Sequence, residues 1–158
     1  MARTVSDSAQ KAAAEDMVHD LNTMEGVDAE VSVRTSGTNP RNTVSVDCSS
    51  ESWRQLAECL RVKHGVDYCS MVTGIHWPEG GPDKNWEVVY HFMRMGISEP
   101  PVIDGMVQPI MTDPSSLRGK EVPLEIEVRV VLPETREPKI ASVQDIWSGA
   151  DWNEKETW

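Results

Sequence analysis

Residues 124–132 alternate between apolar and polar side chains, and this stretch constrains the fold more than any other. Every second side chain in it is apolar, in the order Leu124, Ile126, Val128, Val130 and Leu132. A period of two is typical of a β-strand with one face in a core and the other exposed. Pro133 ends the strand, because proline cannot donate to a strand ladder. The chain therefore needs a sheet with a covered face.

Two amphipathic helices are predicted to supply that cover. The first follows a cap at Ser6 or Asp7, and its apolar stripe has helical spacing at Ala14, Met17, Val18 and Leu21. The second stripe has the same spacing at Trp53, Leu56, Ala57 and Leu60. Gly26 and Gly65 are expected to end the two helices.

Four further strands are predicted at 27–33, 43–47, 66–75 and 86–95. The last of these is apolar on both faces, which is typical of a central or covered strand. The order α-β-β-α-β-β-β indicates an α+β fold: a mixed or antiparallel sheet of about five strands, with two main helices on one face. The intervening stretch 96–120 carries four prolines and no period, so it is predicted to be an exposed excursion or a binding segment.

Charge and hydropathy exclude several classes of partner. The chain has a net charge of −11, from 26 acidic and 15 basic residues. Nucleic acid and anionic lipid both require a cationic surface, so neither is expected to bind directly. No apolar run approaches the roughly 20 residues of a membrane span, and Met1–Ala14 has no apolar core of a secretory signal. A cytoplasmic protein that reaches a membrane only through partners is expected.

The sequence offers no catalytic motif and no cofactor motif. Glycine-rich nucleotide-binding patterns are absent. The four histidines, at 19, 64, 76 and 91, are scattered, and none has a partner at metal-ligand spacing. The three cysteines, at 48, 59 and 69, are interpreted as small apolar residues and are too few for a four-thiolate iron–sulfur cluster. A pair of Cys69 and His91, meeting across adjacent strands, is kept as a minor catalytic alternative.

Residues 141–158 are predicted to be an interface segment appended to an α+β domain of residues 1–140. Three of the six tryptophans lie there, at 147, 152 and 158. Two very short helices are expected, Val143–Trp147 and Trp152–Trp158, with Asp151 capping the second and Glu154 reaching back to it. Such short helices need packing to be stable. For Trp147 the sequence favours the core and an interface equally, whereas Trp152 and Trp158 are assigned to a partner surface.

The same segment resembles a known family. The run from Ser142 to Trp158 has the pattern S-V-x-x-I-W-x-x-A-x-W-x-E-K-E-x-W. It is similar to the signature of the C subunit (30 kDa subunit) of respiratory complex I, the proton-pumping NADH:quinone oxidoreductase, and of its archaeal deazaflavin-linked relatives. The strand Trp86–Phe92 and the strand ending at Pro133 also suit this family, so the resemblance covers roughly residues 66–158. The stretch 96–120 and the turn His76-Trp77-Pro78 are more similar to the archaeal branch.

The chain departs from the family pattern in two places. The family usually has Glu-Arg-Glu where this chain has Glu154-Lys155-Glu156. Lysine keeps the charge but loses the bidentate fork of arginine, so an ion pair between subunits is expected to be weaker here. The family also continues with an Asp-aromatic-x-Gly stretch and a histidine-containing tail that this sequence lacks.

The resemblance implies a non-catalytic scaffold subunit of the hydrophilic arm, peripheral on the cytoplasmic side of the membrane. Its implied partners are the large D-type (49 kDa) subunit, the cluster-bearing B-type subunit and other hydrophilic-arm subunits. Iron–sulfur clusters and flavin or deazaflavin are then expected in the partners and none in this chain. The implied interface residues are Trp147, Asp151, Trp152, Glu154, Lys155, Glu156 and Trp158. The alternative is a free-standing small-molecule-binding or enzymatic domain that uses 96–120 as a lid.

Overall fold

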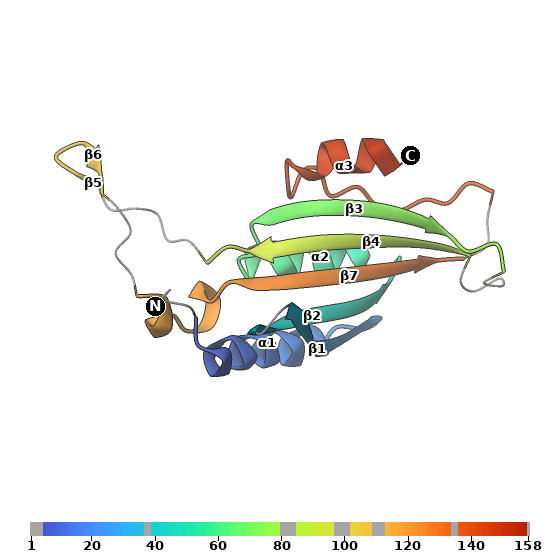
Figure 1. The fold of residues 1–158 in the computed structure, drawn as a ribbon. Coiled ribbons are helices and arrows are strands. Elements are labelled where there is room, and N and C mark those ends of the chain that lie inside the picture. The colour runs from blue at the N-terminus through green and yellow to red at the C-terminus, as the bar shows by residue number, and fades with distance from the viewer. Residues whose placement is uncertain are drawn as a thin grey trace.

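One mixed sheet of five strands organises the protein, in the order β1-β2-β7-β4-β3 (Figure 1). The computed structural model describes residues 5–36, 39–79, 85–96, 102–108, 113–133 and 136–157. The strands are β1 (Val27–Ser36), β2 (Asn39–Ser49), β3 (Tyr68–His76), β4 (Trp86–Arg94) and β7 (Leu124–Leu132). Strands β2 and β7 pair in parallel, and the other neighbours are antiparallel. The predicted α+β class and its mixed sheet are confirmed.

The helices cover one face of this sheet, as predicted. They are α1 (Asp7–Leu21), α2 (Trp53–Val62) and α3 (Ala150–Thr157). Helix α1 packs on β1 and β2, and α3 packs on the edge strand β3 (Figure 1). The Ser6 hydroxyl accepts a hydrogen bond from the Ala9 amide at 3.2 Å, so the predicted cap of the first helix is formed. That helix ends at Leu21, however, before the predicted stop at Gly26.

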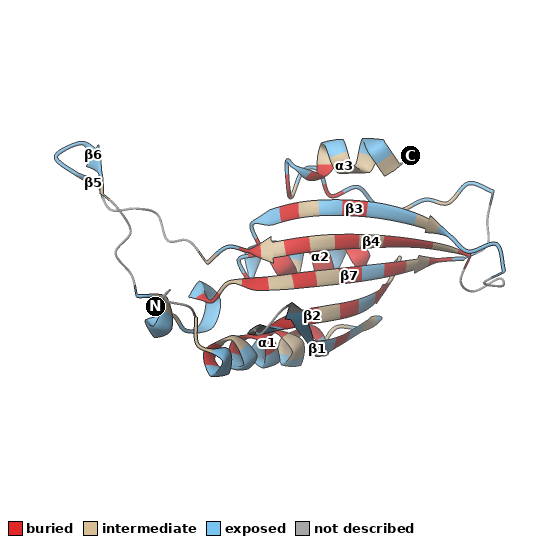
Figure 2. Ribbon diagram, viewed as in Figure 1, coloured by how far each residue is buried: buried red, intermediate tan, exposed pale blue. Residues whose placement is uncertain are grey.

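The core lies between the helices and the sheet. Trp53 of α2 is fully buried, and its ring stacks on Tyr90 of β4 with centroids 4.2 Å apart. Strand β7 alternates buried and more open residues along its whole length, which Figure 2 shows as a banded ribbon. On β4 the outward side chains of Val89, His91 and Met93 are only half-buried, because the helices lie on the other face.

The stretch 96–120 contains short elements that its composition did not predict. A hairpin is formed by β5 (Val102–Ile103) and β6 (Met106–Val107), and it lies apart from the main sheet (Figure 1). Two single 3₁₀ turns follow, η1 (Pro114–Ser116) and η2 (Gly119–Glu121). The described part of this stretch is therefore an excursion that returns to the sheet at β7.

Candidate functional site

The C-terminal segment crosses the helix-covered face and ends on β3. Its first part is held to α2: the Trp53 indole donates to the Ala141 carbonyl at 3.2 Å. Its last part is held to β3, where the Thr157 hydroxyl donates to the Val72 carbonyl at 3.0 Å. Gly74 allows this approach, because a Cβ there would lie 2.8 Å from a Thr157 methyl carbon. The domain itself thus positions α3.

Arg54 fixes the turn that precedes α3. Its guanidinium donates to both carboxylate oxygens of Asp145, at 2.7 and 2.5 Å, and to the Ser142 carbonyl at 2.9 Å. The paired charge holds the pKa of Asp145 below its usual range. A bidentate arginine–carboxylate pair defines orientation as well as distance. The start of the C-terminal segment is therefore oriented from the first turn of α2.

Trp147 belongs to the core of this domain. It is 3% exposed, its ring lies 4.4 Å from Phe92 between centroids, and its indole donates to the Val66 carbonyl at 2.8 Å. The sequence left Trp147 open between the core and an interface. Because Trp147 is buried, it anchors the segment to the domain. Its indole offers almost no surface to a partner.

Glu154 also turns inward, to the turn that precedes α3. Its carboxylate accepts from the Ser142 hydroxyl at 2.6 Å and from the Val143 amide at 2.8 Å. The predicted capping box of Asp151 and Glu154 is not formed, because α3 begins at Ala150 and Asp151 lies within its first turn. Glu154 therefore closes a short loop of this chain.

We expect Glu154→Ala to lower the free energy of unfolding by about 1–2 kcal/mol, because two hydrogen bonds to a charged acceptor are lost at a half-exposed site. Glu156→Ala is the matched control, since Glu156 is exposed on the same helix, and a change below about 0.5 kcal/mol is expected. Urea unfolding of both variants measures the difference. Equal effects would contradict the closing role of Glu154.

The outward surface of α3 carries the other charged candidates. We call Asp151, Trp152, Lys155 and Glu156 the α3 outer face. Trp152 is 73% exposed, the largest exposed fraction among the aromatic side chains described. Lys155 lies 5.9 Å from the centre of its ring and forms an ion pair with Asp151 at 2.9 Å. The exposed indole thus has a charged side chain, Lys155, close to its ring. Trp158, the remaining predicted interface residue, lies outside the described residues.

The Cys69–His91 pair considered from the sequence does not form. Cys69 is 2% exposed within the core, opposite Phe92 in the strand register. His91 lies on the opposite face of β4, and its Nδ1 contacts the Ser70 hydroxyl at 2.5 Å. Burial, with a smaller contribution from Glu154, raises the pKa of Cys69 to about 11. The thiol is therefore protonated at neutral pH and is a poor nucleophile.

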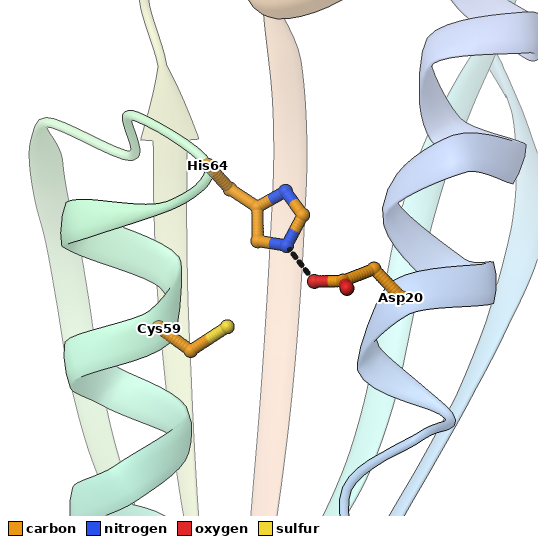
Figure 3. Close-up of side chains that lie close together, drawn as sticks. All are labelled: Asp20, Cys59 and His64. Carbon is orange, nitrogen blue, oxygen red and sulfur yellow. Dashed lines mark hydrogen bonds and ion pairs between the residues drawn. The ribbon is translucent and has the colours of Figure 1, made fainter.

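Potential metal ligands converge at one place in the described part of the chain: Asp20, Cys59 and His64 (Figure 3). Their donor atoms lie within 4.8 Å of one another. No His was predicted to have a Cys partner, because Cys59 and His64 are five residues apart across the end of a helix. The third donor comes from another helix. Proximity of Cys59 to His64 was the only local signal.

No helix among the described residues is long and apolar enough to cross a membrane. The β5–β6 hairpin gathers several exposed apolar side chains. Its four large side chains are all more than half exposed: Val102, Ile103, Met106 and Val107.

Comparison with known proteins agrees with the fold and the C-terminal motif. Residues 46–158 match the family model described as "Respiratory-chain NADH dehydrogenase, 30 Kd subunit". Among solved structures, the chain is similar to one described as Nqo5, a trypsin-resistant fragment, with a TM-score of 0.52 and 17% sequence identity. That likeness covers 90% of this chain and 86% of the other, and at this identity it speaks for the fold alone. None of the curated proteins compared with the chain matches it.

Proposed function

Because this chain belongs to the 30 kDa subunit family of respiratory-chain NADH dehydrogenase, we propose that it is a non-catalytic scaffold subunit of the hydrophilic arm. It docks through the α3 outer face onto the large D-type (49 kDa) subunit, beside the cluster-bearing B-type subunit. The single observation that carries the docking site is Trp152, 73% exposed on a helix that the domain holds rigidly.

The chemistry of this surface suits a protein partner. An indole offers a large apolar area with few rotatable bonds, and tryptophan is enriched among the residues that dominate binding energy. Asp151, Lys155 and Glu156 supply the polar rim that surrounds such an anchor in protein–protein interfaces. The contacts of Trp147, Glu154 and Thr157 fix the helix before binding, which lowers the ordering cost of association.

The rest of the proposal concerns the complex. Electrons pass through iron–sulfur clusters and flavin or deazaflavin held by partner subunits to a quinone or phenazine, and the complex translocates protons. The chain lies peripherally on the cytoplasmic side of the membrane and reaches it only through partners. An archaeal, deazaflavin-linked membership is supported by the stretch 96–120 and by the turn at His76–Pro78.

We expect Trp152→Ala to weaken binding to the large subunit by about 30-fold or more, which corresponds to the roughly 2 kcal/mol of an interface hot spot. Its own fold should change little, because the side chain is mostly in solvent. Co-purification with the tagged large subunit, together with thermal unfolding of the isolated variant, measures the two effects.

Trp77→Ala is the matched control, since Trp77 is 43% exposed and follows β3, outside α3. It should co-purify as the unaltered chain does. Undiminished capture of the Trp152 variant, or a loss shared equally by both variants, would rule out α3 as the docking element.

A further inference from the structure

Three potential metal ligands meet where helices α1 and α2 end. Asp20 is the penultimate residue of α1, Cys59 lies in the last turn of α2, and His64 lies in the turn that follows. Figure 3 shows the three side chains pointing into the gap between the two helices, with His64 Nε2 2.6 Å from Asp20 Oδ2. We propose that these residues bind a divalent transition metal of the zinc class, which clips α1 to the end of α2. The proposal is independent of the docking function.

The donor set matches that class of metal. Zinc takes thiolate, imidazole and carboxylate ligands at about 2.0–2.3 Å, so ligand atoms around a tetrahedral ion lie about 3.3–3.8 Å apart. The three donor atoms here already lie within 4.8 Å of one another. Separating His64 from Asp20 by under ~1 Å and drawing Cys59 inward would complete the geometry. Hard ions such as Mg²⁺ and Ca²⁺ prefer oxygen ligands and are disfavoured by the sulfur.

Metal binding would change the charge state of the Cys59 thiol. Burial, followed by the negative charge of Asp20, raises the pKa of the Cys59 thiol. A bound dication reverses this effect, because it neutralises Asp20 and takes the sulfur as thiolate, releasing the thiol proton to solvent. Burial lowers the pKa of His64, and neutral imidazole is the form that binds metals.

Basic side chains contact two of the three proposed ligand residues. Lys63 contacts one carboxylate oxygen, Asp20 Oδ1, at 2.5 Å, and His64 Nε2 contacts the other, Oδ2, so a metal would have to enter between Oδ2 and the imidazole. Arg94 donates to the His64 carbonyl at 3.2 Å and thereby fixes the histidine backbone. Outer contacts of this kind orient metal ligands. Water would supply the fourth ligand, as in zinc sites that have three protein ligands.

The ordinary interpretation of this cluster is a hydrogen-bonded ion pair between Asp20 and its two basic neighbours. That interpretation accounts for Lys63 and His64 but assigns nothing to Cys59. The thiol therefore separates the two: a metal site needs its sulfur, whereas an ion pair is indifferent to it.

The test is titration of the metal-free full chain with Co²⁺, which reports thiolate ligation through a near-ultraviolet charge-transfer band. We expect one ion per chain, the charge-transfer band, displacement of Co²⁺ by Zn²⁺ and a higher thermal midpoint with metal. Cys59→Ser should abolish the band, whereas Cys48→Ala, in the buried core, should keep it. Far-ultraviolet circular dichroism without metal checks that each variant is folded.

Matched controls are available for the other two ligands. His64→Asn and Asp20→Asn should each weaken Zn²⁺ binding by at least about 100-fold, since even the loss of an outer contact costs 10- to 100-fold. His19→Asn and Asp16→Asn, at exposed positions of α1, should leave it unchanged. The site is overturned if the unaltered chain shows no charge-transfer band, or if the band survives Cys59→Ser. Since Cys59 is only half-buried, that variant decides the matter even if a histidine or aspartate variant unfolds.

Discussion

Trp147→Ala is expected to lower the free energy of unfolding by about 3–5 kcal/mol, the usual cost of deleting a large buried aromatic side chain. The side chain is 3% exposed and packs on Phe92, so alanine would leave a cavity beside the aromatic core. The Val66 carbonyl would also lose its indole donor. Urea unfolding monitored by circular dichroism measures the change.

Trp152→Ala is the natural comparison, because it deletes the same side chain five residues later. Its ring is 73% exposed, so a change below about 0.5 kcal/mol is expected. The two variants thus separate a tryptophan that anchors the segment from one that is available to a partner. A mild effect at Trp147, comparable to that at Trp152, would mean that the segment does not rest on the core as described.

Local sequence could not predict that Trp147 is buried and Trp152 is exposed. The predicted helix Val143–Trp147 is not formed: Trp147 follows a hydrogen-bonded turn, whereas Trp152 lies in α3. Both belong to the same sequence motif. Burial of Trp147 depends on Phe92 and Val66, residues that the chain brings in from β4 and from the turn after α2. Only the assembled sheet defines that pocket. The sequence alone therefore left Trp147 equally compatible with the core and with an interface.

The strands and main helices were predictable because their signals are periodic and local. The alternation of residues 124–132 became β7, and the helical stripes became the buried faces of α1 and α2. The strand order and the parallel pairing of β2 with β7 join segments distant in sequence, so no local period encodes them. The β5–β6 hairpin did have a signal, Asp104-Gly105, a dipeptide typical of two-residue turns, and both residues have positive φ.

The sequence pattern around Arg94 indicates a buried charged residue, although none was predicted above. In β4 the inward positions recur every second residue from Trp86, and the same period places Arg94 on the core face. A charged residue at such a position needs buried acceptors. The guanidinium donates to three backbone carbonyls, of Val122 at 2.9 Å, Gly119 at 3.0 Å and His64 at 3.2 Å. It therefore ties η2 and the turn after α2 to the end of the sheet.

Arg94→Met is accordingly expected to lower the free energy of unfolding by about 3–5 kcal/mol. Methionine fills similar space but leaves three carbonyls without their donor, and each buried polar group left unpaired costs about 1–3 kcal/mol. Burial lowers the pKa of Arg94, in keeping with a guanidinium that relies on neutral carbonyls and not on a carboxylate in contact. Urea unfolding at neutral pH measures the loss.

Arg41→Met is the matched control, because that side chain is 53% exposed and, within the described part of the chain, forms its ion pair with Glu125. An exposed ion pair contributes at most about 1 kcal/mol, so the control should remain close to the unaltered chain. Arg94→Lys should fall between the two, since lysine keeps the charge but cannot reach three separated carbonyls with a planar fork. If the lysine variant were as stable as the unaltered chain, the charge alone would be what the site requires. If the methionine variant were as stable as the unaltered chain, water would have to hydrogen-bond the carbonyls of η2. Arg94 would then not be what joins this loop to the sheet.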